Sequence, residues 1–236
     1  MDVVDELVRA DIGVHAEILG GREVTAGMHK DVLRWLRASL RPGMRTVETG
    51  CGLSTAVFAA GATAHTCVSP FADEYRRIAS WCARRGIGTE AVRFVEGRSD
   101  VVLPSIDLQD VDLALIDGSH AFPHAFVDFW YLALRLKPGG LLLVDDLQLW
   151  TAGTLSGFLR EQPEWELVHD FPPRAAVFRL TGPLEVLGAW SRQPYVVARS
   201  VDLGVPGLRG YLELLRHGRL RWMVVRAREG LRRRFG

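Results

Sequence analysis

The fold is decided by the stretch Val47-Glu48-Thr49-Gly50-Cys51-Gly52-Leu53-Ser54-Thr55. A strand-compatible run leads into two glycines, and the helix-compatible run Ala56-Val57-Phe58-Ala59-Ala60 follows. This order predicts a strand, a glycine-bearing turn and a helix. Gly50 and Gly52 allow the backbone to turn sharply and to approach a ligand without a Cβ in the way. The amide groups of the turn and of the first helical turn would then face that ligand.

The residues around the two glycines bear on the class of ligand. A dinucleotide-binding turn carries a third glycine, at the position that Thr55 occupies here. The carboxylate of Glu48, two residues before Gly50, suits a positively charged cofactor better than a pyrophosphate. Glu48-Thr49-Gly50-Cys51-Gly52 resembles the first motif of class I S-adenosylmethionine (SAM) dependent methyltransferases, acidic-x-Gly-x-Gly. A glycine turn with a purely structural role is the alternative.

Size and composition indicate a globular protein with a sizeable core. The chain has 236 residues, of which 48% are hydrophobic and 24% charged, and a net charge of +1. Its three cysteines have neither a disulfide pattern nor metal-ligand spacing. The N-terminus lacks the features of a signal peptide, and no apolar run reaches the roughly 20 residues of a membrane span. We therefore expect a cytoplasmic protein with one α/β domain and an appendage.

Further strands and helices alternate along the chain. Strands are predicted at 64–68, 91–96, 111–116 and 141–144, separated by helical patterns at 73–85 and 123–136. Such alternation predicts a parallel sheet with helices on both faces. A helix at 153–159 and two strands at 165–168 and 175–180 come last; the link between these strands is too short for a parallel crossover, so they should be antiparallel. Over about residues 40–180 this order resembles the Rossmann-like class I methyltransferase fold, a seven-stranded, mostly parallel sheet with a terminal antiparallel hairpin.

Segments on either side complete the predicted organisation. Residues 1–40 are expected to form an N-terminal helical cap, with Thr25 capping its second helix. Residues 41–180 form the SAM-binding domain. Residues 181–236 form a basic, partly helical extension with eleven arginines and four acids. Its helical pattern at 208–231 favours packing or homodimerisation over a charged partner. No nucleic-acid module accompanies it, and no nucleic-acid partner is expected.

The class I resemblance implies a set of cofactor contacts. At the turn these would be Glu48, Gly50, Cys51, Gly52 and Ser54. The usual acid after the second strand is missing, and Ser69 is the remaining candidate there for the ribose. After the third strand, Ser99 is a candidate for the adenine edge, or alternatively a helix cap. Asp117, after the fourth strand, completes this set.

Acidic residues follow three of the predicted strands. The carboxyl ends of parallel strands meet at one rim, which gathers Glu48, Asp117 and the pair Asp145-Asp146. Carboxylates so close repel one another unless something positive joins them. The sulfonium and amino groups of SAM would supply part of that charge, and a divalent cation would supply the rest.

A narrower resemblance rests on Ile116-Asp117-Gly118-Ser119-His120 and on the run from Lys137 to Asp146, Lys-Pro-Gly-Gly-Leu-Leu-Leu-Val-Asp-Asp. These segments are similar to a bacterial methyltransferase family (the methyltransferase domain 24 type) that is related to small-molecule O-methyltransferases. In the magnesium-dependent members the metal acids match Asp117, Asp145 and Asp146. The catechol type has a catalytic lysine where this chain has His120, so the resemblance implies a histidine base.

Each of these residues also has an alternative interpretation without a metal or a base. In that case His120 caps the following helix, Asp146 is a helix N-cap, and Asp117 only positions the cofactor's amino group. The leading hypothesis is SAM-dependent O-methylation of a small molecule, a sugar or secondary metabolite, with Asp117 and His120 catalytic and Mg²⁺ as a candidate cofactor. The alternatives are a SAM-binding scaffold without turnover and an NAD-dependent oxidoreductase. The missing third glycine and the missing acid after the second strand count against the oxidoreductase.

Overall fold

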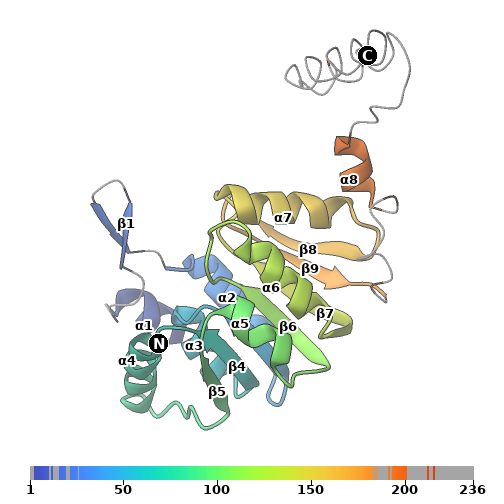
Figure 1. Cartoon of the computed structure of the whole chain (residues 1–236). Helices are drawn as coiled ribbons and strands as arrows, with labels where there is room; N and C mark the ends of the chain where they lie inside the picture. Colours follow the sequence, from blue (N-terminus) through green and yellow to red (C-terminus); the bar gives the residue numbers. More distant parts are fainter. Residues whose placement is uncertain are drawn as a thin grey trace. The chain divides into compact units, whose positions relative to one another are not determined.

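The chain divides into two compact units, Met1–Glu185 and Val186–Gly236, which are described separately (Figure 1). In this computed structural model, the described residues are 3–10, 12, 16–19, 22–25, 27–182, 184, 191, 193–200, 212 and 215. Among them, no helix has the length and apolar character needed to cross a membrane.

The first unit is built on a seven-stranded sheet with the order β5-β4-β3-β6-β7-β9-β8. The neighbours from β5 to β7 pair in parallel, whereas β9 pairs antiparallel with both β7 and β8. This arrangement confirms the predicted fold class, including the terminal antiparallel hairpin. The strands are β3 (Arg45–Thr49), β4 (Ala64–Ser69), β5 (Val92–Glu96), β6 (Val111–Ile116), β7 (Leu136–Val144), β8 (Trp165–Phe171) and β9 (Ala175–Leu180).

Helices cover both faces of this sheet, as buried parallel strands require. Leu113 and Leu115 of β6 share one apolar cluster with residues of the first four helices, so those helices cover that face. They are α1 (Val3–Arg9), α2 (Lys30–Ser39), α3 (Leu53–Ala60) and α4 (Ala72–Ala83). A second set packs against itself in the order α5, α6, α7. Its members are α5 (Ser99–Val102), α6 (His124–Ala133) and α7 (Trp150–Glu161), and the short 3₁₀ helix η1 (Leu103–Ser105) follows α5.

The N-terminal segment differs from the predicted all-helical cap. Between α1 and α2 lie two short strands, β1 (Ala16–Leu19) and β2 (Arg22–Thr25), paired antiparallel. The sequence Gly20-Gly21 between them is typical of a hairpin turn and was the available signal for this pair of strands. Thr25 therefore ends a strand, and the N-cap of α2 is His29, whose Nδ1 accepts a hydrogen bond from the Asp31 amide at 3.4 Å.

The predicted break at Lys137-Pro138-Gly139-Gly140 lies inside β7. Val111 pairs with Leu136 and Leu113 pairs with Leu141, so the register shifts between them and absorbs the extra residues. In the second unit, α8 spans Pro194–Arg199. The helix predicted at 208–231 lies outside the described residues, except for Leu212 and Leu215, which are helical and exposed.

Candidate active site

Three neighbouring strands end at the rim of the sheet where the glycine turn lies. Thr49 is paired with Ile116, and Ile116 is paired with Val144. The next residues along the chain, Gly50, Asp117 and Asp145, therefore leave the sheet side by side. This is the rim at which open parallel sheets bind their ligands.

Gly50 is required by the packing of the turn. Its φ is 93°, and a Cβ at this position would collide with the backbone carbonyl oxygen of Asp117. Its amide donates to the Val68 carbonyl at 2.9 Å, and the Gly52 amide donates to Thr55 Oγ1 at 3.1 Å. These two amides, which were expected to face a ligand, are thus used within the protein. In the first turn of α3, the Thr55 amide also donates within the protein, to the Gly52 carbonyl at 3.1 Å. The amides of Leu53 and Ser54 are therefore the candidate donors for a ligand.

Glu48, which was predicted as a cofactor contact, lies beneath the turn. Its side chain is 1% exposed. The carboxylate accepts hydrogen bonds from Ser54 Oγ at 2.6 Å and from Thr55 Oγ1, and it lies 3.1 Å from His65 Nε2. Ser54, another predicted cofactor contact, is buried as well, and its hydroxyl is used by Glu48. A buried carboxylate needs such partners, and the first turn of α3 supplies two of them.

The other predicted cofactor residues differ in what they offer. Cys51 is in the core cluster, so its side chain is not available to a ligand. The Ser69 hydroxyl accepts from the Phe71 amide at 3.2 Å and is buried, whereas the Phe71 ring is 57% exposed. Ser99 is the first residue of α5, whose N-cap is Arg98, so the capping alternative for Ser99 is wrong.

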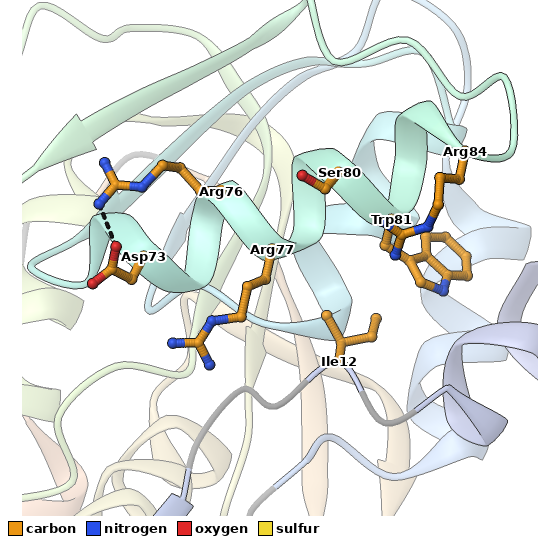
Figure 2. Close-up of a pocket in the computed structure, with 7 residues that line it drawn as sticks. All are labelled: Ile12, Asp73, Arg76, Arg77, Ser80, Trp81 and Arg84. Carbon is orange, nitrogen blue, oxygen red and sulfur yellow. Dashed lines mark hydrogen bonds and ion pairs between the residues drawn. The ribbon is translucent and has the colours of Figure 1, made fainter.

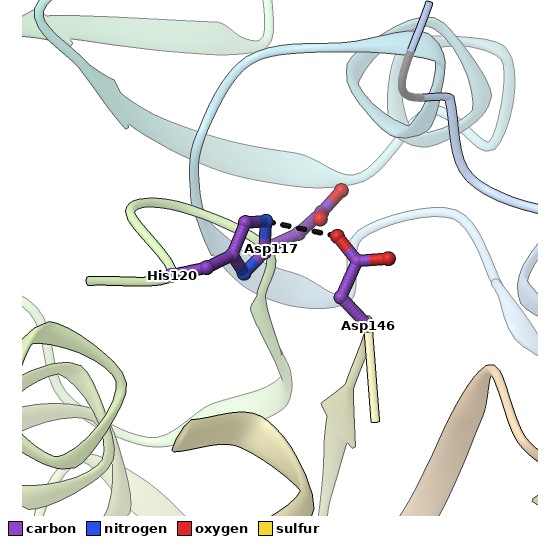
Figure 3. Close-up of side chains that lie close together, drawn as sticks. All are labelled: Asp117, His120 and Asp146. Atoms are coloured by element: carbon purple, nitrogen blue, oxygen red, sulfur yellow. Dashed lines mark ion pairs between the residues drawn. The ribbon is translucent and has the colours of Figure 1, made fainter. Parts of the chain in front are cut away.

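Asp117, His120 and Asp146 meet at the rim (Figure 3). One donor atom from each lies within 4.8 Å of the others, and His120 Nε2 is 2.9 Å from Asp146 Oδ2. Asp145, which was predicted as a third metal acid, is outside this group and 5% exposed. Both Asp145 and Asp146 lie beyond the end of β7, and Asp146 has a left-handed backbone with a φ of 55°. Asp146 is not the N-cap of α7 either, because that position is Leu149.

Negative charge is concentrated in this cluster. Burial raises the pKa of Asp117 well above its ordinary value, and the charges of Asp145 and Asp146 raise it further. Burial, followed by the charge of Asp146, raises the pKa of Asp145 to about 7. The hydrogen bond from His120 lowers the pKa of Asp146. A cation bound at this rim would relieve the repulsion, so the residues present fit both the positive groups of SAM and a metal ion.

Asp128 of α6 was missed by the sequence analysis. It is fully buried, and neither oxygen has a hydrogen bond of normal geometry among the described residues. Burial raises its pKa, although the nearby hydroxyls of Ser99 and Thr49 lower it. A Cβ on Gly118 would lie 3.4 Å from Asp128 Oδ2, so this carboxyl sits behind the loop that begins with Asp117. An acid within an otherwise apolar helix was the available signal.

A pocket of about 460 Å³ lies elsewhere, along α4 (Figure 2). It contains none of the residues predicted for the cofactor, the metal or catalysis. Its lining consists of Ile12, Asp73, Arg76, Arg77, Ser80, Trp81 and Arg84.

The sequence and the fold of this chain are similar to those of known methyltransferases. Residues 47–147 match a family model described as a methyltransferase domain. The cofactor-bound Rv0187 from MTB is 16% identical, with 78% of this chain and 92% of that chain covered and a TM-score of 0.61. The O-methyltransferase TomG from Streptomyces achromogenes, solved in complex with SAM, is 17% identical, with 67% and 83% covered and a TM-score of 0.54. A SAM-dependent O-methyltransferase from Thermotoga maritima is 14% identical, with 78% and 73% covered and a TM-score of 0.54. The comparison with curated proteins gave no match.

At such low identities the structural likenesses establish the fold. The family model adds the segment that matters for function, because residues 47–147 run from the glycine turn through Asp117 to the acids after β7. Residues 47–147 are similar to the methyltransferase-domain family, and the sheet has the fold of the structurally similar methyltransferases. Together the family match and the fold support a SAM-dependent methyltransferase.

Proposed function

We propose that this methyltransferase transfers the methyl group of SAM to a hydroxyl oxygen of a small-molecule acceptor, with His120 as the base. The observation that carries the proposal is the 2.9 Å contact between His120 Nε2 and Asp146 Oδ2 at the rim beside Asp117. Histidine titrates near neutrality and suits the removal of a hydroxyl proton. O-methyltransferases among the structures of the same fold are consistent with an oxygen acceptor.

Bound SAM supplies an electrophilic methyl group on its sulfonium sulfur. His120 takes the acceptor's hydroxyl proton at Nδ1, the ring nitrogen that does not face Asp146, as the oxygen–carbon bond forms and the carbon–sulfur bond breaks, which leaves S-adenosylhomocysteine. The pKa of Asp146 is lowered by its hydrogen bond to His120, so this carboxylate stays ionised and stabilises the protonated imidazole. The rim aligns acceptor and methyl group, which is the main source of rate enhancement in such a displacement.

Cofactor binding is assigned to the backbone of the turn and to the rim. The turn at Gly50, Cys51 and Gly52 with the first turn of α3 would hold the methionine end, and Asp117 would face its ammonium group. Ser99 and the Phe71 ring, at the ends of β5 and β4, would lie along the nucleoside. Glu48 and Ser54 keep the turn in shape and do not contact SAM.

A divalent cation is part of this proposal. Asp117 and Asp146 would hold it through carboxylate oxygens, the ligands that Mg²⁺ prefers, with water completing the shell. The cation would lower the pKa of the acceptor hydroxyl. With His120 as a third ligand the donor set would suit Zn²⁺ or Ni²⁺ better than Mg²⁺. We leave Asp145 out of the proposed ligand set because it lies outside the group of Asp117, His120 and Asp146.

The proposal also covers the location of the protein and the roles of its segments. We propose a cytoplasmic location, supported by three cysteines that are all buried and unpaired. Residues 41–180 would be the catalytic domain and residues 1–40 its cap. Residues 181–236 would be an extension for packing or homodimerisation, and no nucleic-acid partner is proposed.

The test is a screen of hydroxylated and aminated small molecules with SAM, in which S-adenosylhomocysteine is quantified by mass spectrometry with Mg²⁺ and with a chelator. We expect turnover with hydroxylated acceptors, stimulated by Mg²⁺ and lost in His120→Ala and Asp146→Asn. Asp107→Asn, at an exposed acid outside the rim, is the control and should keep full activity. Turnover restricted to amines, or His120→Ala with wild-type turnover, would contradict the proposal. A preference for Zn²⁺ or Ni²⁺ over Mg²⁺ would indicate that His120 is a metal ligand and would contradict its role as the base.

A further inference from the structure

Two large aromatic side chains stand exposed beside the active-site cluster. Phe122 is 68% exposed and Trp150 is 69% exposed. Their ring centroids are 6.1 Å apart with an interplanar angle of 53°, and the Phe126 ring is 6.0 Å from that of Phe122 at 67°. We call Phe122, Phe126 and Trp150 the aromatic platform. Exposed apolar side chains that lie together can form a binding surface for an apolar ligand.

The platform is attached to the catalytic loops. Phe122 follows His120 by two residues, and Trp150 begins α7, four residues after Asp146. Thr151 Oγ1 donates to the His120 carbonyl oxygen at 2.7 Å, and Thr151 is 5% exposed. This part-buried hydrogen bond ties the first turn of α7 to the loop after β6. The backbone segments that carry Phe122 and Trp150 are therefore held together at His120.

We propose that the aromatic platform binds a planar aromatic ring of the methyl acceptor and directs its hydroxyl group toward His120. This inference rests on the proposed function and names the acceptor class, a hydroxylated aromatic compound. Phenyl and indole rings favour an incoming aromatic ring in edge-to-face or offset contact. They also lose little conformational entropy on binding, because each has only two side-chain torsions.

The negative charge at the rim narrows the class of methyl acceptor further. Asp117 and Asp146 lie close to His120 at the ends of β6 and β7, with Asp146 Oδ2 2.9 Å from His120 Nε2. These carboxylates would repel a carboxylate or phosphate placed next to the acceptor's hydroxyl. A neutral phenol is the better match. A sugar is a poorer match, because two of the three platform side chains, Phe122 and Phe126, offer no hydrogen-bonding group.

The test uses the full chain loaded with S-adenosylhomocysteine. Binding of 2-naphthol, of its saturated counterpart decahydro-2-naphthol and of methyl α-D-glucoside is measured by calorimetry for the wild type, Phe122→Ala and Trp150→Ala. The control is Leu134→Ala, because Leu134 is 50% exposed and lies at the far end of α6, about 15 Å from its first turn. Affinity for S-adenosylhomocysteine is measured for every variant.

We expect 2-naphthol to bind the wild type most tightly of the three probes. Phe122→Ala and Trp150→Ala should each weaken it roughly tenfold, and Leu134→Ala should leave it unchanged. Affinity for S-adenosylhomocysteine should be the same in all variants. Equal binding of naphthol and decahydronaphthol, preferential binding of the glucoside, or unchanged naphthol affinity in both platform variants would overturn the inference. These results would leave the proposed O-methylation standing, because that depends on turnover and on His120.

Discussion

Nε2 of His120 and Oδ2 of Asp146 lie 2.9 Å apart and join the loops that follow two adjacent parallel strands, β6 and β7. Each side chain is about a quarter exposed, at 23% and 24%, so the pair is open to a ligand but partly shielded from water. A paired carboxylate orients the imidazole and stabilises its protonated form. The pair thus has the geometry of a general base with its supporting acid.

Removing the base should act on the chemical step alone. His120→Ala should lower kcat by roughly 10²- to 10⁴-fold, the usual contribution of a positioned base, without weakening SAM binding. Asp146→Asn should lower kcat as well, because the amide cannot stabilise the imidazolium. The measurement is steady-state turnover together with calorimetric affinity for S-adenosylhomocysteine. A kcat close to that of the wild type in His120→Ala would remove histidine from the mechanism.

The glycine turn allows a matched comparison. Gly50→Ala places a Cβ against the Asp117 carbonyl at a φ of 93°, whereas Gly139→Ala has a similar φ of 82° with open space around it. Both should pay a backbone cost of about 1–3 kcal/mol, measurable by urea unfolding. Only Gly50→Ala should also displace the Asp117 loop and lose S-adenosylhomocysteine binding. Equal binding by the two variants would show that the close approach is irrelevant to the cofactor.

The pair of Glu48 and His65 should matter for stability. Their side chains are 1% and 0% exposed, and Glu48 also holds Ser54 and Thr55. Glu48→Ala leaves these partners without an acceptor and should cost about 3–5 kcal/mol in free energy of unfolding. Glu48→Gln keeps one acceptor oxygen and should cost less. If Glu48→Ala unfolds at the same urea concentration as the wild type, this network does not support the turn.

Asp128 should give stability a pH dependence. Burial raises its folded-state pKa above the unfolded value of about 3.9, so between the two values the folded protein binds more protons than the unfolded chain. Its contribution is fully present below the unfolded pKa and is lost as the pH rises through the folded pKa. Asp128→Asn has no such proton to lose, so its stability relative to the wild type should increase from acidic toward neutral pH. Urea unfolding over this range is the measurement, and parallel pH curves would contradict the assignment.

The fold was predictable because its signals are local. The apolar runs that became β6 and the core of β7 were unambiguous, and the short link before Ala175 fixed the antiparallel pair. The N-terminal hairpin was missed because β1 and β2 are only four residues each, too short for a clear period. The start of β7 was missed because Pro138 and the glycines resemble a break until the register shift is seen.

The site was predictable in position but only partly in detail. Strand ends place Asp117 and Asp146 at one rim from sequence alone. The direction of each side chain depends on packing, which the sequence does not show. In the structure Glu48 lies beneath the turn, and His120, but not Asp145, lies in the group with Asp117 and Asp146. Asp128 and the Thr151 hydrogen bond join segments far apart in the sequence, and no local pattern encodes such contacts.

The most direct test of the account is calorimetric titration of S-adenosylhomocysteine into the wild-type protein and into Gly50→Ala, with folding of both checked by circular dichroism. We expect micromolar binding to the wild type and at least a tenfold weaker affinity for the variant, a loss of about 1.4 kcal/mol. A folded wild-type protein that does not bind S-adenosylhomocysteine would contradict the assignment of a SAM site to the glycine turn.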